Sequence, residues 1–495
     1  MRAEKLEPHF LIRQFQNGTH HSTEESIQFV CIFLLAVLLT IVIGRRYYSS
    51  LSKYPGPFLG SFSTLWQMRH AMRGNFSKDL HQLHLDHGDF VRISHREISV
   101  THPDAVRDVL QAPLRSPKEA SRRQKNIGNA YTVSSILPME PQMDDVLRHM
   151  RECFFALADA GKAVEVGDFW TWAAFDIVGE VTFSRRFGFL NELRDIGGAI
   201  ASTGVLMRYA TVMGYAIPLH TLLLDNPFMR ALNRVFRFSG NVHAFKVATD
   251  ALDGREKSSD GKQDMVARWF ENLNKSRGSM DLVEIHAAAT SNISAGSDTV
   301  SAALQSLYYH ALQAPDALRL LEEEVLAADA AGALSDIPQH KEVSQLPYLQ
   351  ACVKEALRMH PAGPWSLPRK APAQGLKLGD EHFPAGTLLS VNPWVIHYHP
   401  KLFERPKSFE PERWLDPERK AKEGQFWIPF GAGYNRCPGR QLAMMEVAKM
   451  AALMIRDFEI ERADPNQEWK WHNNFSAVPY GWDCYVRRRG GEKAN

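Results

Sequence analysis

The chain has 495 residues, of which 44% are hydrophobic and 23% are charged, and this balance is typical of a globular protein. Its formal net charge of +2, with no arginine-rich tract, argues against a nucleic-acid-binding function. The cysteines are scattered, with no Cys-x-x-Cys pair, which argues against a zinc site, an iron–sulfur cluster or a disulfide framework. We therefore expect reduced thiols facing the cytosol at Cys31, Cys153, Cys352, Cys437 and Cys484.

An uncharged apolar run of 18 residues occupies positions 27–44, near the lower length limit for a membrane-spanning helix. Arg45 and Arg46 follow at once, so the positive-inside bias places the larger C-terminal part in the cytoplasm and residues 1–26 in the lumen. A cleaved signal peptide and a buried core helix are the alternative interpretations. Asn17 begins a glycosylation sequon on the predicted lumenal side.

A proline-glycine hinge follows the anchor at residues 45–58, because Pro55-Gly56-Pro57 cannot continue a helix. Residues 59–495 then show no composition break, and we expect one mainly α-helical domain with small β-sheets. Helical periodicity prevails over residues 141–349, interrupted by a polar surface loop at 254–263. Alternating, β-branched patterns predict short strands at residues 90–93, 97–100, 388–391 and 483–486.

The most informative motif is the run FGAGYNRCPGR at residues 430–440. Its glycines allow a tight turn and a close approach to a flat ligand. Helix formers follow Arg440, so the N-terminal amides of a helix would face Cys437 and favour a thiolate. A lone cysteine is more often a small buried hydrophobe, but this context favours a sulfur ligand on a haem iron.

A second motif, Ala295-Gly296-Ser297-Asp298-Thr299, lies within a helical stretch that begins near Met280. Its small residues would let a flat cofactor or dioxygen approach, and Asp298 and Thr299 could relay protons. The alternative is tight helix packing, with the threonine bonded to a carbonyl one turn earlier.

Together these motifs resemble those of the cytochrome P-450 superfamily, in its fungal membrane-bound form. The resemblance implies that Cys437 is the axial haem ligand, that Phe430 shields its sulfur and that Gly431 belongs to the haem-binding loop. It also implies that Thr299 steadies iron-bound oxygen while Asp298 supplies protons. The family usually has Arg two residues before the cysteine, whereas this chain has Asn435 there and Arg436 next.

The same resemblance assigns an architectural role to Glu355 and Arg358, which are three residues apart on a predicted helix, and to Arg413 downstream. In the family such residues form a buried charge network beneath the haem-binding loop. A solvated surface pair is the ordinary alternative for the Glu-x-x-Arg spacing. Candidates for the haem propionates are Arg369, Arg148 and Arg436.

The implied activity is that of a haem-thiolate monooxygenase that inserts one atom of O2 into a lipophilic small molecule, in fungal secondary metabolism. The cofactor would be haem b. No flavin or nicotinamide fingerprint occurs in the chain, so electrons would come from NADPH through a separate membrane-bound reductase at the endoplasmic reticulum. Arg436, Arg440 and Lys449 would meet its acidic surface.

By analogy with the family, four segments would line the substrate pocket: residues 291–294, 365–367, 477–478 and 127–136. Three alternatives to the monooxygenase remain. They are a reductase-independent isomerase or dehydratase, a non-enzymatic haem sensor or electron carrier, and a membrane protein without a cofactor.

Overall fold

The structure is a computed structural model that describes residues 8–111, 126–223, 226–229, 249–252, 263–275, 280–473 and 475–490, with side chains from residue 26 onward. The α-helices are α1 (Pro8–Tyr47), α2 (Phe58–Phe62), α3 (Leu65–Arg73), α4 (Phe76–His87), α6 (Val133–Ile136), α7 (Glu140–Ala160), α8 (Val166–Phe183), α9 (Phe189–Glu192), α10 (Ala199–Met213), α11 (Ile217–Leu223), α14 (Met265–Lys275), α15 (Leu282–Ala311), α16 (Pro315–Ala330), α17 (His340–Val343), α18 (Pro347–Met359), α19 (Pro393–His397), α20 (Pro417–Gly424) and α21 (Arg440–Asp457). Short 3-10 helices are η2 (Gly128–Tyr131), η3 (Leu137–Met139), η4 (Ile196–Gly198), η6 (Pro411–Trp414) and η7 (Gly433–Asn435), and η1 (Val106–Gln111) is a π-helix.

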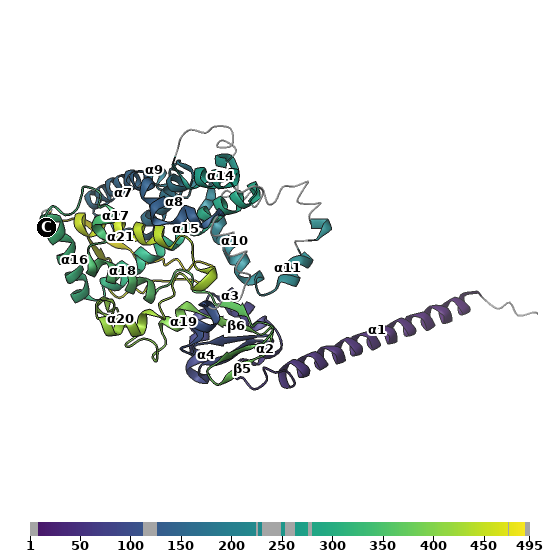
Figure 1. Cartoon of the computed structure of the whole chain (residues 1–495). Helices are drawn as coiled ribbons and strands as arrows, with labels where there is room; N and C mark the ends of the chain where they lie inside the picture. The colour runs from purple at the N-terminus through teal and green to yellow at the C-terminus, as the bar shows by residue number, and fades with distance from the viewer. Residues whose placement is uncertain are drawn as a thin grey trace, which may run out of the picture.

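The strands form three small sheets at the edges of a mainly helical body, as the sequence predicts (Figure 1). The largest sheet has the order β1-β2-β6-β3, in which only the β2–β6 pair is parallel. The strands are β1 (Phe90–Ser94), β2 (Glu97–Val100), β3 (Leu367–Lys370), β4 (Leu376–Leu378), β5 (Glu381–Phe383), β6 (Leu388–Val391), β7 (Phe458–Arg462) and β8 (Cys484–Arg488). Each of the four predicted strands overlaps one of these elements, namely β1, β2, β6 and β8.

The helical core is organised around α15, which is 30 residues long. Its first turn is capped by Asp281, whose side chain accepts the backbone N–H of Glu284 at 2.8 Å. The helix then passes through the main apolar core, which it shares with α7, α8, α18 and α21. Trp170 of α8 stacks on Tyr308 of α15, with 5.0 Å between the ring centroids. Close packing on these sides fixes α15 as a rigid wall for the site described below.

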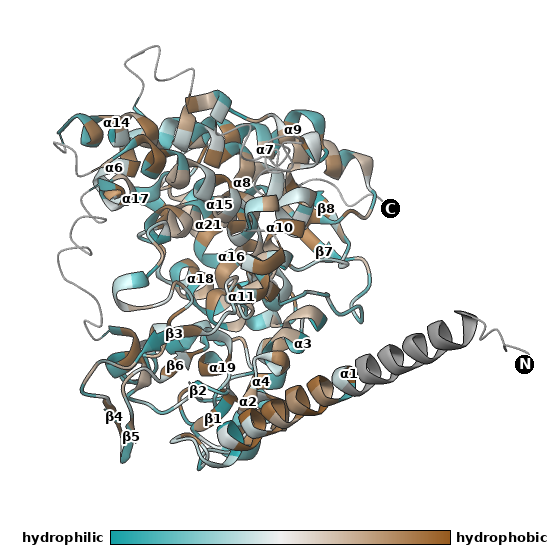
Figure 2. Ribbon diagram, turned by 90° about the vertical axis from the view of Figure 1, so that its right-hand side faces the viewer, coloured by the Kyte–Doolittle hydropathy of each residue, from teal (hydrophilic) through white to brown (hydrophobic). Residues whose placement is uncertain are grey.

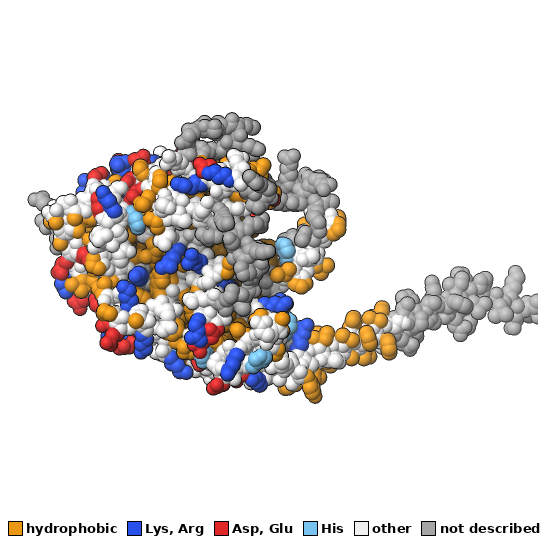
Figure 3. Space-filling model, viewed as in Figure 1, with side chains coloured by type: hydrophobic (Ala, Val, Ile, Leu, Met, Phe, Trp, Pro, Cys, Tyr) orange, Lys and Arg blue, Asp and Glu red, His pale blue; other side chains and the backbone are white. Residues whose placement is uncertain are grey.

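Helix α1 leaves the body at the end where the main sheet lies (Figures 1 and 2). Its segment Ser26–Tyr47 is long and apolar enough to cross a membrane, and none of it is buried against the protein. Hydrophobic side chains cover this segment on the face seen in Figure 3. The helix continues back to Pro8, so residues 8–26, predicted as a separate tail, belong to the same helix. This position outside the core excludes the buried-helix interpretation.

Two predictions lie where the structure is not described. Residues 254–262 of the predicted polar loop are outside the described residues. The side chain of Asn17, the predicted glycosylation site, is also outside the part of the chain whose side chains are described.

Candidate active site

A loop with two left-handed glycines brings Cys437 to the start of α21. Gly431 and Gly433 both have φ of +68°, a conformation that favours glycine. A Cβ atom at Gly433 would lie 1.9 Å from the carbonyl oxygen of Leu110, so only glycine fits where the loop meets η1. The backbone N–H of Cys437 donates to the carbonyl of Phe430 at 2.8 Å and closes the loop.

The sulfur of Cys437 lies among protein atoms but opens into a cavity. Burial raises the pKa of this thiol, backbone hydrogen bonds from Gly439 and Arg440 lower it, and the net pKa lies above the ordinary value. Those N–H groups are the unsatisfied donors at the start of α21, which favour negative charge. Because a coordinating cation would deprotonate the thiol outright, the geometry suits a thiolate metal ligand better than a free nucleophile.

The cavity beside Cys437 has a volume of about 380 Å³ and mostly apolar walls. Its walls come chiefly from α8, α15, α21, the segment before β3 and the Cys437 loop. The lining side chains include Tyr131, Val178, Val181, Thr182, Ser291, Asn292, Ala295, Thr299, Val300, Ala303, Leu357, Trp365, Leu367, Phe430, Leu442, Ala443, Glu446, Val447 and Phe475.

Thr299 of α15 shares this cavity with Cys437. Its hydroxyl donates to the carbonyl of Ala295, one turn earlier, at 2.8 Å. The threonine therefore makes the local bond of the structural interpretation and still lines the cavity. With its hydrogen committed to Ala295, the oxygen can act only as an acceptor toward a group in the cavity.

Gly296 also lines the cavity, but its lack of a side chain has another cause. A Cβ atom at this position would lie 2.7 Å from Cγ2 of Val178 on α8. The glycine is thus required for the close packing of α15 on α8, as the structural interpretation predicts. Ala295 and Ala303 also line the cavity, and their small side chains project little from α15 into it.

Asp298 faces a different space from Thr299. Its carboxylate accepts the hydroxyl of Ser476 at 3.3 Å and lines a second cavity of about 330 Å³. Burial raises the pKa of Asp298 to about 6, although the Ser476 hydrogen bond lowers it. Helix α15 therefore presents a hydroxyl to one cavity and a titratable carboxyl to the other.

The predicted charge network is present and completely buried. Both guanidinium groups bind the same carboxylate: Arg358 reaches Glu355 through Nε at 3.0 Å and Nη2 at 2.9 Å, and Arg413 reaches it through Nε at 3.0 Å. All three side chains have 0% exposure, which excludes the surface-pair interpretation. Burial raises the pKa of Glu355, but the two arginines and a backbone N–H outweigh burial and hold that pKa below its ordinary value.

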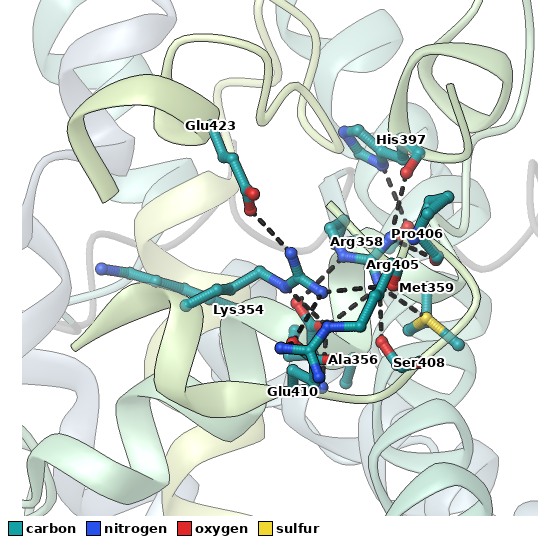
Figure 4. A network of polar contacts seen from close by, with 12 residues as sticks. Lys354, Ala356, Arg358, Met359, His397, Arg405, Pro406, Ser408, Glu410 and Glu423 are labelled. Atoms are coloured by element: carbon teal, nitrogen blue, oxygen red, sulfur yellow. Dashed lines mark hydrogen bonds and ion pairs between the residues drawn. The ribbon is translucent and has the colours of Figure 1, made fainter. Parts of the chain in front are cut away.

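Further partners satisfy the remaining donors of the network (Figure 4). The guanidinium of Arg358 donates to the backbone oxygens of His397, Pro406 and Ser408 at 2.8–3.1 Å. Arg413 donates to Glu423 at 2.7 Å, and the indole of Trp414 donates to Glu355 at 2.9 Å. The cluster contains matched charges and filled hydrogen bonds, which is the condition under which buried ion pairs persist.

His397 connects this network to the Cys437 loop. Its Nδ1 lies 3.1 Å from the carbonyl oxygen of Arg358, and its Nε2 accepts the backbone N–H of Ile428 at 3.0 Å. The Ile428 carbonyl then accepts the N–H of Gly431 at 2.9 Å. Burial lowers the pKa of His397 to about 3, so the ring is neutral, with its proton on Nδ1.

A family model described as cytochrome P450 matches residues 45–480. The chain belongs to the cytochrome P450 family. The cytochrome P450 monooxygenase gsfF of Penicillium aethiopicum is 27% identical over 502 residues, which cover 93% of this chain and 99% of the relative. A pisatin demethylase of Fusarium vanettenii is 28% identical over 471 residues, or 90% of each chain. The cytochrome P450 monooxygenase cicH of Emericella nidulans is 30% identical over 478 residues, covering 89% and 94%.

This cytochrome P450 is an oxygenase enzyme, and its family implies a haem cofactor, a redox partner and a small-molecule substrate. The residues of the site fit haem. A single sulfur ligand opens into an apolar cavity, and a Cβ atom at Gly439 would lie 3.9 Å from that sulfur. Small residues of α15 form another part of the wall. Thiolate-ligated haem needs a sulfur ligand for its iron and apolar space for its flat ring, and the cavity beside Cys437 offers both.

The arginines predicted for the propionates of this P450 have three different positions. Arg369 is two residues beyond Leu367 on β3, so it is on the same strand face as a lining residue of the main cavity. Arg436 lines a neighbouring cavity of about 300 Å³ together with Cys437, whereas Asn435 lines the main cavity. The assignment of Arg148 is wrong, because this side chain is exposed on α7 and pairs with Asp145 at 2.6 Å.

Two other predictions are corrected. Lys449 cannot meet a partner surface, because its ammonium group is 0% exposed and bonds to Glu140 and Asp144, each at 2.5 Å. Residues 477–478 do not line the main cavity: Ala477 is buried, and Val478 lines the second cavity. The other three predicted wall segments contribute Ser291, Trp365, Leu367 and Tyr131 among others.

Glu446 is a lining residue that sequence reasoning missed. It lies on α21, one turn beyond Leu442 and Ala443, and is 1% exposed. Its Oε2 atom has no hydrogen-bond partner among the described residues, and burial raises the pKa of this carboxyl well above its ordinary value. The helical spacing from Arg440 was the available signal, since positions 442, 443 and 446 share one face.

Proposed function

We propose that this P450 inserts one oxygen atom from O2 into a lipophilic small molecule and uses electrons from an NADPH-dependent reductase. The observation that carries the proposal is that Cys437 and Thr299 line the same apolar cavity. When bound, thiolate-ligated haem supplies O2 activation and O–O bond cleavage. The protein supplies the ligand, the shape of the cavity, the exclusion of water and the delivery of protons.

The position of each residue in the structure supports its proposed role. Cys437 would hold the iron, with Phe430 and Gly431 shaping the loop, and Arg369 is the propionate partner favoured by its strand face. Thr299 would accept a hydrogen bond from a group in the cavity, since its own proton is donated to Ala295. Asp298 would feed protons past Thr299 from the second cavity.

The proposal of a lipophilic substrate rests on the cavity wall. Most lining side chains are aliphatic or aromatic, and the amide of Asn292 is already committed to Tyr131, Thr182 and Met265. A charged substrate would lose its hydration there without gaining a partner. The relatives are fungal proteins, which supports a role in fungal secondary metabolism.

We also propose a location at the endoplasmic reticulum, with α1 in the membrane and the body in the cytoplasm. The apolar segment Ser26–Tyr47 and the two arginines at positions 45 and 46 support this orientation. Arg436 and Arg440 remain candidates for reductase docking, since both are exposed beside Cys437.

The proposal is tested by the carbon monoxide difference spectrum of the reduced protein and by product analysis with and without NADPH and reductase. We expect the spectrum of thiolate-ligated haem and NADPH-dependent product. Cys437→Ser should abolish both, whereas Cys153→Ser, a half-buried cysteine away from the cavity, should retain them. Product formed without NADPH would favour an isomerase or dehydratase instead, and a Cys437→Ser protein with unchanged spectrum would refute the proposal.

A further inference from the structure

The junction between α1 and the body gathers positively charged side chains. Arg45 and Arg46 lie in the last turn of α1, while Arg92 is on β1, and His95 and Arg96 form the turn between β1 and β2. Helix α1 leaves the body beside these two strands (Figures 1 and 2). We call these five residues the junction cluster.

The charges of the junction cluster act on one another. Burial and the charge of Arg46 together lower the pKa of Arg92 to about 10. Burial and the charges of Arg45, Arg96 and Arg92 lower the pKa of His95 to about 4. Side chains from α1 and from the β1–β2 hairpin are therefore close enough to disfavour each other's positive charge.

Arg92 is buried without an acidic partner. Its side chain is 1% exposed, and the hydrogen bonds it makes within the described residues all go to backbone carbonyls. Nη2 donates to Arg45 at 2.8 Å and to His95 at 3.3 Å, and Nε donates to Ser94 at 3.4 Å. Nη1 has no partner among those residues. A buried charge is ordinarily paired, so the positive charge of Arg92 is left uncompensated and one of its nitrogens is unused.

Other polar atoms at the junction also lack partners. In the described part of the chain, Nε of Arg46, Nδ1 of His95 and Oγ of Ser49 are buried and make no hydrogen bond. The guanidinium carbon of Arg46 lies 5.3 Å from the ring centroid of Tyr47. A buried polar atom without a partner destabilises the protein, and a partner from outside the chain would remove that cost.

Glu97, the acid that follows the cluster in the chain, does not neutralise it. Its carboxylate accepts a hydrogen bond from the side-chain amide of Gln67 at 2.9 Å. Burial raises the pKa of Glu97 above its ordinary value, although the hydrogen bonds of Gln67 and Ser390 and the charge of Arg96 lower it. The carboxylate is thus engaged by neutral groups of the body.

The location of the junction cluster indicates which anion would fill it. Arg45 and Arg46 lie at the end of the apolar segment Ser26–Tyr47, so in the proposed orientation the cluster is level with the cytoplasmic lipid headgroups. Tyr47 and Tyr48 are exposed there, and tyrosine is enriched at this depth of the bilayer. The guanidinium fork matches the oxygen geometry of phosphate.

We propose that the junction cluster binds the phosphate of one anionic phospholipid of the cytoplasmic leaflet, with Arg46 and Arg92 as its ligands. Arg45 and Arg96 are exposed, so the phosphate would enter from their side. Since Nη1 of Arg92 is covered, the half-buried side chain of Arg46 would rotate as the phosphate enters.

The composition of the cluster also selects the headgroup. No acid belongs to the cluster, so an ammonium group on the lipid would find no partner there. Phosphatidylinositol, which has no amine, is therefore favoured over phosphatidylcholine and phosphatidylserine.

Such a lipid would fix the direction in which α1 leaves the body. Arg92 is on β1 and bonds to the backbone of Arg45 on α1, so an anion held by Arg92 and Arg46 would join the membrane helix to the main sheet. The inference rests on the proposed membrane location and is independent of the reaction at Cys437.

The first test counts the lipids that the haem-loaded full chain retains in native mass spectrometry from detergent micelles. With phosphatidylinositol added, the wild type should retain one molecule, and Arg46→Gln and Arg96→Gln should each retain several-fold less. Arg73→Gln removes an equal charge from an exposed position of α3, outside the cluster, and should match the wild type. Equal retention in all these proteins would overturn the proposal.

Arg92 needs a variant that keeps its charge, because loss of the whole side chain would also break the bond to α1. Arg92→Lys keeps the charge and a donor for the Arg45 carbonyl but loses the fork. We expect several-fold weaker retention of phosphatidylinositol, with an unchanged carbon monoxide spectrum to show that the protein is folded. Wild-type retention in Arg92→Lys would overturn the role of Arg92. If this variant does not fold, the Arg46→Gln and Arg96→Gln results decide.

The second test is the midpoint of thermal unfolding in detergent, which rises when a ligand binds the folded state. Phosphatidylinositol should raise the midpoint of the wild type, phosphatidylserine at equal concentration should raise it less, and phosphatidylcholine should leave it unchanged. Inorganic phosphate at that concentration should also leave it unchanged, because it has no acyl chains to hold it beside α1. An equal rise with inorganic phosphate or with phosphatidylcholine would overturn the assignment to an anionic lipid.

The outcomes separate this site from the proposed membrane location. If the wild type does not float with phosphatidylcholine vesicles that contain phosphatidylinositol, the membrane location itself fails. If the wild type floats but neither retains phosphatidylinositol nor is stabilised by it, only the lipid site fails.

Discussion

Nε2 of His397 accepts the backbone N–H of Ile428 at 3.0 Å, while the backbone oxygen of His397 accepts a hydrogen bond from Arg358, also at 3.0 Å. One buried histidine thus joins the charge network to the segment that precedes the Cys437 loop. The carbonyl of Ile428 continues the connection to Gly431 at 2.9 Å. The position of the sulfur therefore depends on a chain of hydrogen bonds that begins at Glu355 and Arg358.

Replacement of His397 by Phe should weaken haem retention and stability together. The ring is neutral and buried, so its loss leaves the Ile428 N–H and the Arg358 carbonyl without partners, at a cost of about 1–3 kcal/mol for each unsatisfied group. Thermal unfolding and haem content per protein measure the effect. His382→Phe, on the outer face of β5, is the control and should behave as the wild type. Normal haem content in His397→Phe would show that the loop holds its shape without this link.

Removal of one partner from the buried charge network should be more damaging. Glu355→Gln leaves Arg358 without a carboxylate partner and Arg413 with Glu423 alone, and breaking a buried pair costs about 3–5 kcal/mol. We expect little folded, haem-loaded protein, as measured by haem content and by the midpoint of thermal unfolding. Glu323→Gln breaks an exposed pair with Arg319 at 2.8 Å and should leave both measurements unchanged.

The stability that Glu355 contributes through the buried charge network depends on pH, and the sign of this dependence can be worked out. Because the pKa of Glu355 is held below its ordinary value, the folded state binds the proton less tightly than the unfolded chain. The contribution of Glu355 to stability is therefore complete above the pKa of the unfolded chain, about 4.3, and is lost as the pH falls below it. A midpoint of thermal unfolding that rises on acidification through this range would contradict the charged network.

Sequence reasoning identified the parts of the site that are local in the chain. The spacings within the 430–440 run and within residues 295–299 are local, and the resemblance to the cytochrome P-450 family implied that the two motifs share one site. The contacts of Glu423 with Arg413 and of Trp414 with Glu355 could not be predicted, because they depend on how η6 packs on α18 and how α20 packs on η6. The roles predicted for Arg148, at a haem propionate, and for Lys449, at the reductase surface, were wrong for a related reason.

Helical periodicity shows that two residues share a face but not whether that face meets solvent or protein. Asp144 and Arg148 are one turn apart on α7, yet Arg148 is exposed and pairs with Asp145, while Asp144 binds Lys449 of α21. The ammonium group of Lys449 thus forms buried ion pairs that link α21 to α7. Adjacent helical residues point to different faces, and the structure adds that both faces meet cavities, one containing Thr299 and the other Asp298.

Substitution of Thr299 by Ala should separate oxygen consumption from product formation. The Thr299 hydroxyl lines the cavity, and a positioned proton relay contributes about 10²–10⁴-fold to rate. We expect NADPH oxidation to continue while product per NADPH falls strongly. Thr299→Ser keeps the hydroxyl and should recover most of the product. Equal coupling in the Ala variant would remove Thr299 from the relay.

The buried carboxyl of Glu446 should make the stability of the protein depend on pH in the opposite direction to Glu355. Burial raises the pKa of its carboxyl well above the ordinary value, whereas the unfolded chain ionises at its ordinary pKa. The folded state then binds more protons than the unfolded one, so Glu446 destabilises the fold increasingly as the pH rises above that ordinary pKa.

Glu446→Gln removes this dependence while preserving shape. The midpoint of thermal unfolding of the haem-loaded variant should match the wild type near pH 4 and exceed it as the pH rises from the ordinary pKa of the carboxyl toward the raised pKa of the folded state. Asp159→Asn, at an exposed pair with Arg488, should show no such divergence. If the Glu446→Gln and wild-type curves run parallel, Glu446 is ionised in the loaded enzyme, and a cationic or donating partner must face it there.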